Sequence, residues 1–331
     1  MMENFMTNVS TVENFSGLVG YGGQGIIKEA YVSGMRHRGE ALAIDKNTAF
    51  GIASGTKGFT ALLVLKLIDE GKLTLADKVF DLLPQPFPNM DKNITVRQLL
   101  SHTSGIYDYF DESILIDFTT MFEKVPIQKI NGPSDMYPLL IEGEQKSEPG
   151  GAFRYCNSGF VILAMLVETV TGQSYECYLN KVLVDALELK HTGCYRSDQL
   201  PANVAVGYEK KGKTWVANTF DIPIICTGDG GLYTCAEDMA KVWSAFVEGD
   251  LLSEGLRDEA LSVQSVREGN SCYGLGFFIH LGEDGKALSY ALIGEDPGLS
   301  FFSRYCKDDG QVLVIMSNTS FGAWAMEDVL K

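Results

Sequence analysis

The chain has 331 residues, 45% of them hydrophobic, and carries a formal net charge of −16 at pH 7. Its length and hydrophobic content suit one large domain, or two interlocked ones, with a sizeable core. The negative charge argues against nucleic acid or an anionic membrane surface as a partner, because both would repel the chain. The longest apolar run, residues 160–167, is too short to cross a bilayer, so we expect no membrane segment.

The seven cysteines are scattered singly between Cys156 and Cys306, without the spacing of a metal site. We therefore expect free thiols in a reducing compartment, and neither a metal nor another cofactor. The first residues, Met1 to Phe5, contain neither the basic start nor the apolar stretch of a signal peptide, which favours a cytoplasmic location. The sequence does not indicate the oligomeric state.

Hydrophobic patterning predicts strands near both ends of the chain and helices in the middle. A strand pair is expected over residues 15–21 and 25–32, followed by helices over residues 54–70, 75–83, 95–100, 157–171 and 174–187. Later strands are expected over residues 204–209, 214–216, 272–281, 287–293, 299–305 and 311–317, with helices over residues 236–247, 253–261 and 323–330.

The simplest arrangement of these elements is an α+β fold. Strands from both ends of the chain form one antiparallel sheet flanked by helices, because they are otherwise separated by a long helical stretch. Residues 1–53 and 200–331 would then form an α/β sandwich domain, and residues 54–199 an inserted, mainly helical region. A ligand cleft is expected at the seam between the two.

Ser54 and Lys57 lie where a hydrophobic strand, residues 49–53, meets an apolar helix, residues 59–68. Residues i and i+3 share one face of a helix, so the two side chains can touch. A desolvated lysine amine can accept the proton of a serine hydroxyl and make it a nucleophile. The alternative is a serine N-cap followed by a solvated lysine.

Tyr155 and Asn157 form a second candidate pair, between a Gly-rich turn and the helix over residues 157–171. A tyrosine near a lysine ammonium could relay a proton, and an amide could contact both the lysine and a substrate carbonyl. The alternative is a packed aromatic ring and a helix N-cap. Tyr178 and Asn180 have the same spacing, but their helical pattern favours packing.

Taken with their neighbours, these motifs resemble the serine β-lactamase and penicillin-binding-protein family, in particular its class C branch. That branch includes family VIII carboxylesterases, D-aminopeptidases and D-alanyl-D-alanine carboxypeptidases. The resemblance runs in family order over roughly residues 15–318. It is carried by residues 50–60 (FGIASGTKGFT), 96–105 (VRQLLSHTSG), 149–159 (PGGAFRYCNSG) and 230–239 (GGLYTCAEDM), and by Pro297-Gly298.

The resemblance implies a β-lactamase/transpeptidase-like fold and a role for each matched residue. Ser54 would be the nucleophile and Lys57 the general base. Tyr155 would be the proton relay and Asn157 a substrate contact. The backbone N–H groups of Ser54 and Glu295 would form the oxyanion hole, which Gly294 allows the substrate to approach closely.

One motif departs from the family pattern. A strand before Pro-Gly carries Lys-Thr-Gly or His-x-Gly in the family, where the cation helps to bind a substrate carboxylate. The corresponding residues here are Leu292, Ile293 and Gly294, and His280 on another strand is a weak substitute. With Glu295 following, we expect a substrate that is not strongly anionic, and weak or no β-lactamase activity.

The leading hypothesis is a serine hydrolase that acts through an acyl-enzyme on an ester or amide of a small molecule or peptide. One alternative is a non-catalytic binding or regulatory protein on the same fold, and another is a penicillin-binding protein without turnover. His102 is expected to serve loop structure. Residues 107–146, rich in aromatic and acidic side chains, are expected to shape the substrate pocket.

Overall fold

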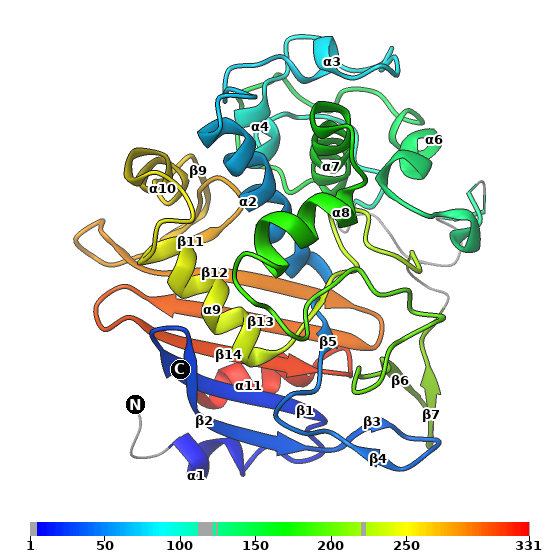
Figure 1. The fold of residues 1–331 in the computed structure, drawn as a ribbon, viewed down its shortest axis with the longest axis vertical. Helices are drawn as coiled ribbons and strands as arrows, with labels where there is room; N and C mark the ends of the chain where they lie inside the picture. The colour runs from blue at the N-terminus through cyan, green and yellow to red at the C-terminus, as the bar shows by residue number, and fades with distance from the viewer. Residues whose placement is uncertain (1–4, 112–121, 124, 220–222, 331) are drawn as a thin grey trace.

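A computed structural model describes residues 5–111, 122–123, 125–219 and 223–330. At its centre is an antiparallel sheet of eight strands in the order β2-β1-β14-β13-β12-β11-β10-β9. The strands are β1 (Gly17–Gly23), β2 (Ile26–Ser33), β9 (Ser265–Glu268), β10 (Ser271–Tyr273), β11 (Phe278–Leu281), β12 (Ala287–Asp296), β13 (Leu299–Cys306) and β14 (Gln311–Ser317). Because β1 pairs with β14, strands from both ends of the chain share one sheet (Figure 1). The predicted α+β class is therefore confirmed.

Helices cover both faces of this sheet (Figure 1). α9 (Ala236–Val247) packs on β1, β2 and β14 from one side, whereas α11 (Gly322–Leu330) packs on β13 and β14 from the other and contacts α1 (Phe5–Val9). Successive residues of a strand point to opposite faces. Accordingly, Leu18 and Met316 join the core under α9, while Val19 and Ile315 join the core under α11.

The middle of the chain forms a helical half beside the sheet (Figure 1). α2 (Thr56–Asp69) packs against α7 (Asn157–Thr171), and α7 also contacts α4 (Val96–Leu100) and α8 (Tyr175–Leu179). The first ten residues of α2 are all buried, because the helix is apolar on every side and is enclosed by the rest of the fold. The shorter helical segments are η2 (Ala53–Gly55), α3 (Val79–Leu82), η3 (Ile127–Lys129), η4 (Pro133–Met136), α6 (Tyr137–Leu140), the π-helical η5 (Asn180–Val184) and α10 (Glu254–Ala260).

Three small ladders complete the described elements. They are β3 (Met35–His37) with β4 (Leu42–Ala43), β5 (Phe50–Gly51) with β8 (Tyr233–Thr234), and β6 (Tyr208–Lys211) with β7 (Thr214–Ala217). The seven cysteines are unpaired. Within the described residues, no helix combines the length and the apolar character needed to cross a membrane.

Several predicted boundaries were wrong. The strand expected over residues 272–281 is a hairpin of β10 and β11, because the chain turns at Gly276, whose φ of +98° favours glycine. The helix expected from residue 75 begins only at Val79, since Lys78 is extended and bridges Thr95. The strand expected from residue 204 begins at Tyr208, and β9 was not predicted.

Candidate active site

Ser54 lies in η2, the turn that joins β5 to α2. The residue before it, Ala53, has a φ of +46°, which is costly for a residue with a side chain and marks a sharp change of chain direction. The N-cap of α2 is Gly55, and no side chain caps this end. Ser54 is therefore not the simple N-cap of the alternative interpretation, and its side chain lines a cleft instead.

Lys57 is buried, with 2% of its surface exposed, and its amine has three acceptors around it. Lys57 Nζ lies 2.9 Å from Ser54 Oγ, 2.7 Å from Asn157 Oδ1 and 2.8 Å from the backbone oxygen of Asp229. The predicted contact between Ser54 and Lys57 is confirmed, and the solvated-lysine alternative is wrong. An uncharged amine has two N–H donors and one lone pair. If the two N–H groups of Lys57 donate to Asn157 and Asp229, the lone pair of the amine points toward Ser54.

The orientation of the Asn157 amide follows from its other neighbours. Its Nδ2 donates to the backbone oxygen of Phe110 at 2.8 Å and to Asp108 Oδ2 at 3.3 Å. An ionised carboxylate and a carbonyl oxygen can only accept hydrogen bonds, so the amide nitrogen must point toward them and Oδ1 must point toward Lys57. Cys156, and not Asn157, is the N-cap of α7.

Asp108 was missed by the sequence interpretation, although it lies in the segment expected to shape the pocket. Its buried carboxylate accepts hydrogen bonds from the backbone N–H groups of Asn157 and Ser158, both at 3.0 Å. Burial raises the pKa of Asp108 to about 7, while these N–H groups and the charge of Lys57 act in the opposite direction. Asp108 lies 49 residues before Asn157, so no short spacing in the sequence indicates that these two side chains meet.

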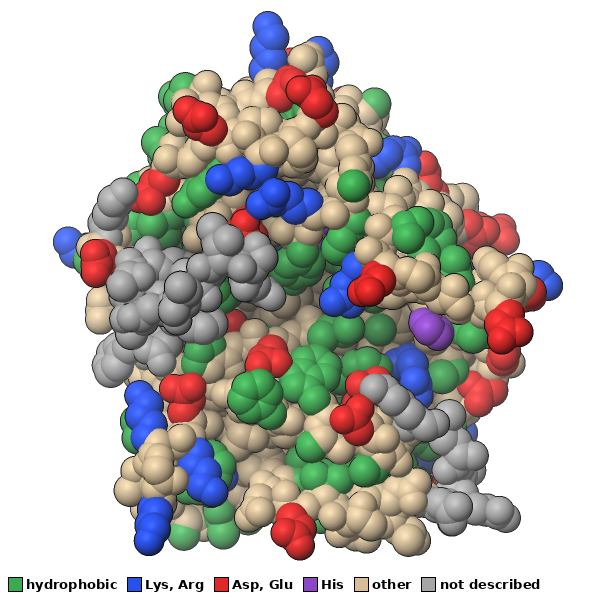
Figure 2. Space-filling view, turned by 180° about the vertical axis from the view of Figure 1, so that it is seen from behind, with side chains coloured by type: hydrophobic (Ala, Val, Ile, Leu, Met, Phe, Trp, Pro, Cys, Tyr) green, Lys and Arg blue, Asp and Glu red, His purple; other side chains and the backbone are tan. Residues whose placement is uncertain are grey.

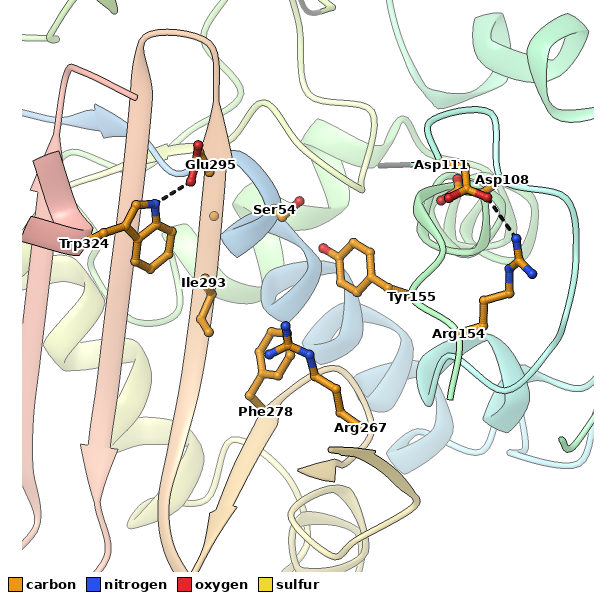
Figure 3. A pocket seen from close by; sticks show the side chains of 11 residues that line it. Ser54, Asp108, Asp111, Arg154, Tyr155, Arg267, Phe278, Ile293, Glu295 and Trp324 are labelled. Atoms are coloured by element: carbon orange, nitrogen blue, oxygen red, sulfur yellow. Dashed lines mark hydrogen bonds and ion pairs between the residues drawn. The ribbon is translucent and has the colours of Figure 1, made fainter. Parts of the chain in front are cut away.

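Tyr155 lies between Lys57 and a cluster of rings. Lys57 Nζ is 4.9 Å from the centroid of the Tyr155 ring, and the hydroxyl end of Tyr155 points toward Ser54 (Figure 3). The imidazole of His102 lies behind Tyr155, with ring centroids 4.5 Å apart. The turn η2 with the start of α2, and the segment that leads into α7, thus bring together the four sequence-predicted residues Ser54, Lys57, Tyr155 and Asn157.

His102 is buried and does not line the cleft, in keeping with the expected role in loop structure. Its Nδ1 accepts a hydrogen bond from the Cys156 backbone N–H at 3.1 Å, so a neutral ring carries its proton on Nε2. Burial and the nearby charge of Lys57 hold the pKa of His102 well below its usual value. Among the described residues, Nε2 has no hydrogen-bond partner.

Strand β12 lies directly against the turn that carries Ser54. A side chain at Gly294 would place its Cβ 2.9 Å from the Ser54 backbone nitrogen, so only glycine allows this approach. Glu295 lines the cleft and accepts a hydrogen bond from Trp324 Nε1 of α11 (Figure 3). The position of Leu292 corrects the sequence interpretation. Alternation turns it away from the cleft and onto Gly58 of α2, and Ile293 lines the cleft instead.

The cleft has a volume of about 490 Å³ and lies between the helical half and the edge of the sheet. In the view from behind, it appears as a hollow across the middle of the molecule, with acidic and basic side chains on its rim (Figure 2). Its lining residues are Ser54, Asp108, Asp111, Arg154, Tyr155, Arg267, Phe278, Ile293, Gly294, Glu295 and Trp324. Part of the expected pocket-shaping segment, residues 112–121 and 124, lies outside the described residues.

The geometry and the sequence agree with the comparisons with known proteins. A family model described as "Beta-lactamase" matches residues 12–329. This chain belongs to the beta-lactamase family. A penicillin binding protein from Bacillus halodurans shares its fold with a TM-score of 0.91 and 33% identity, over 100% of this chain and 99% of that chain.

Two further relatives indicate how far the likeness extends. PbpX of Bacillus subtilis (strain 168) is 28% identical over 271 residues, which are 82% of this chain but only 62% of PbpX. A D-stereospecific amidohydrolase from Streptomyces sp. has a TM-score of 0.79 at 23% identity, over 98% of this chain and 97% of that chain. The last likeness shows the beta-lactamase/transpeptidase-like fold alone.

Proposed function

We propose that this beta-lactamase family member is a serine hydrolase that forms an acyl-enzyme with an ester or an amide. The observation that carries the proposal is the 2.9 Å contact between Ser54 Oγ and a buried Lys57 amine at the wall of a cleft. Two further acceptors, Asn157 Oδ1 and the Asp229 backbone oxygen, orient this amine toward Ser54. Such an arrangement is what activation of a serine by a lysine requires.

The steps follow from these positions. Uncharged Lys57 accepts the proton of Ser54 as Oγ bonds to the substrate carbonyl carbon, and the carbonyl electrons move onto its oxygen. The backbone N–H groups of Ser54 and Glu295 stabilise this oxyanion, because Gly294 holds β12 against the turn. The bond to the leaving group then breaks, and the leaving group takes a proton relayed through Tyr155. Water releases the acyl group in a second round of the same transfers.

The charge near the reacting bond limits the substrate. Glu295 lines the cleft beside Gly294, and its carboxylate repels a negative group placed next to the scissile carbonyl. We therefore propose that substrates are small esters, amides or peptides with no negative charge at this end. Efficient β-lactam hydrolysis is not expected.

The proposal is tested by trapping the acyl group on Ser54. Wild-type protein given a short neutral p-nitrophenyl ester is expected to release p-nitrophenol and to gain the mass of one acyl group. Ser54→Ala is expected to do neither, because it has no oxygen to acylate. Ser134→Ala is a matched control, since Ser134 is exposed and bonded to Glu168 away from the cleft.

Three outcomes would contradict the proposal. Turnover by Ser54→Ala at the wild-type rate would show that another group carries the reaction. Absence of both turnover and adduct in the wild type, across neutral esters and amides, would favour a binding protein on this fold. A stable adduct with a β-lactam, in a wild type that turns over no ester or amide, would instead point to penicillin binding without turnover.

A further inference from the structure

Arg267 is a cleft residue that neither the sequence motifs nor the proposed steps use. It lies on β9, an edge strand, and lines the cleft. The carbon of its guanidinium is 5.6 Å from the centroid of the Phe278 ring on β11. The guanidinium extends over this ring into the cleft, on the side where Tyr155 and Ile293 lie (Figure 3). Stacking on an aromatic face holds a guanidinium without using its N–H donors.

The other charged groups of the cleft have partners. Arg154 forms an ion pair with Asp111 at 2.9 Å, and Asp108 accepts N–H groups at the start of α7. Glu295 accepts a hydrogen bond from Trp324. In contrast, Arg267 forms neither an ion pair nor a hydrogen bond within the described part of the chain. The N–H groups of this guanidinium therefore remain available to bind a ligand in the cleft.

The position of Glu295 and that of Arg267 therefore differ in charge. Glu295 lies on the side near α11, and Arg267 lies away from it, beyond Ile293 and beside Phe278, whereas Asp111 and Arg154 lie on the side opposite to α11 (Figure 3). A planar guanidinium matches the two oxygens of a carboxylate in a paired, charge-assisted hydrogen bond. A more highly charged anion would be less suitable, because Glu295 and Asp108 also line the cleft.

We propose that Arg267 binds a carboxylate of the substrate, so that the preferred substrates are esters or amides with a carboxylate remote from the scissile carbonyl. This inference rests on the proposed function and names its substrate class. The sequence expectation of a substrate that is not strongly anionic considered only the residues around Leu292 and Glu295. Arg267 gives one anionic group a position in the cleft away from Glu295.

Matched pairs of p-nitrophenyl esters test this assignment. Each pair is a p-nitrophenyl half-ester of adipic or suberic acid and the same compound with its free carboxylate methylated, so the two differ in the remote charge and by one methyl group. Two chain lengths cover different reaches from Ser54 to Arg267. Wild-type protein is expected to have the higher kcat/KM for the charged member of at least one pair, and added salt should reduce this preference.

The ratio to compare is kcat/KM for the charged ester divided by kcat/KM for its methylated partner. Arg267→Gln is expected to lower this ratio by about 10- to 100-fold, because it removes one charge-assisted pair of hydrogen bonds. Arg267→Lys should retain part of the preference, since it keeps the charge but loses the planar fork. Lys286→Gln removes a cation in the turn between β11 and β12, outside the cleft lining, and should leave the ratio unchanged.

The outcomes separate this inference from the proposed function. If the ratio is unchanged in Arg267→Gln and turnover still depends on Ser54, the role of Arg267 is wrong but the proposed function stands. Loss of Ser54 dependence overturns the proposed function. The role of Arg267 is then decided by calorimetric binding of suberic acid monoamide to Ser54→Ala and to the double variant with Arg267→Gln. Equal affinities would contradict the assignment, and weaker binding by the double variant would support it.

Discussion

Lys57→Met is expected to lower the rate of Ser54 acylation by about 10²- to 10⁴-fold, the range for loss of a positioned general base. Methionine has a similar length and fills the same buried space, but it cannot accept the Ser54 proton. It also leaves Asn157 Oδ1 and the Asp229 backbone oxygen without their donor. Each unpaired buried acceptor costs about 1–3 kcal/mol.

The measurement is the initial burst of p-nitrophenol from a neutral ester, followed with intact-mass detection of the acyl group and with thermal unfolding. Lys66→Met is the matched control, because Lys66 lies on the same helix but contacts Asp69 and the Leu251 backbone oxygen, outside the cleft. A burst of wild-type rate in folded Lys57→Met protein would exclude Lys57 as the base.

The parts of the site that follow local periodicity could be predicted from the sequence. The spacing of Ser54 and Lys57 within one helical turn is sufficient to bring their side chains together. The turn before Asn157 is sufficient to place the start of α7. The strand patterns lie near both ends of the chain and are separated by a helical stretch. One sheet made from both ends could therefore be predicted, and β1 does pair with β14.

The parts that depend on tertiary contacts could not be predicted. The face to which Leu292 points depends on the register of β12, since a shift by one residue exchanges Leu292 with Ile293. Arg267 lies on a short edge strand with mostly exposed residues and no alternating pattern. Asp108 reaches Asn157 only because the loop after α4 folds back over the start of α7.

Asp108→Asn is expected to lower kcat/KM by about 10²-fold, the loss that a small misplacement of a catalytic group can cause. Its amide oxygen can still accept the backbone N–H groups of Asn157 and Ser158, so the start of α7 is retained. Its amide nitrogen, however, then faces the amide nitrogen of Asn157, and two donors cannot pair. Asn157 is displaced or turned, and Lys57 loses the acceptor that orients it.

The same carboxylate makes activity depend on pH near neutrality. The pKa of Asp108 is about 7, and protonation places an O–H in the carboxyl group that otherwise accepts from Asn157. We therefore expect kcat/KM of the wild type to rise as pH passes through about 7. Cys156, Tyr109 and His102 stay uncharged here, because burial raises the pKa of the thiol and of the phenol and lowers that of the imidazole. Lys57 is the other titratable group in contact with Asn157.

Stability should change with pH in the opposite direction. The pKa of Asp108 is raised from 3.8 in the unfolded chain to about 7 in the fold, so between these values the folded protein binds the proton more tightly. The contribution of this group to stability is greatest below pH 3.8 and falls as pH rises to about 7. The unfolding free energy of the wild type, measured relative to that of Asp108→Asn, should therefore fall as pH rises.

Asp238→Asn is the matched control for both measurements. Asp238 is also a buried carboxylate that accepts backbone N–H groups, those of Lys190 and His191, but it does not line the cleft. It is expected to affect thermal stability without changing the rise of kcat/KM near pH 7. If Asp108→Asn kept both the wild-type rate and the wild-type pH profile, Asp108 would not position Asn157. The Asn157 amide would then be oriented by the backbone oxygen of Phe110, a contact that no side-chain charge controls.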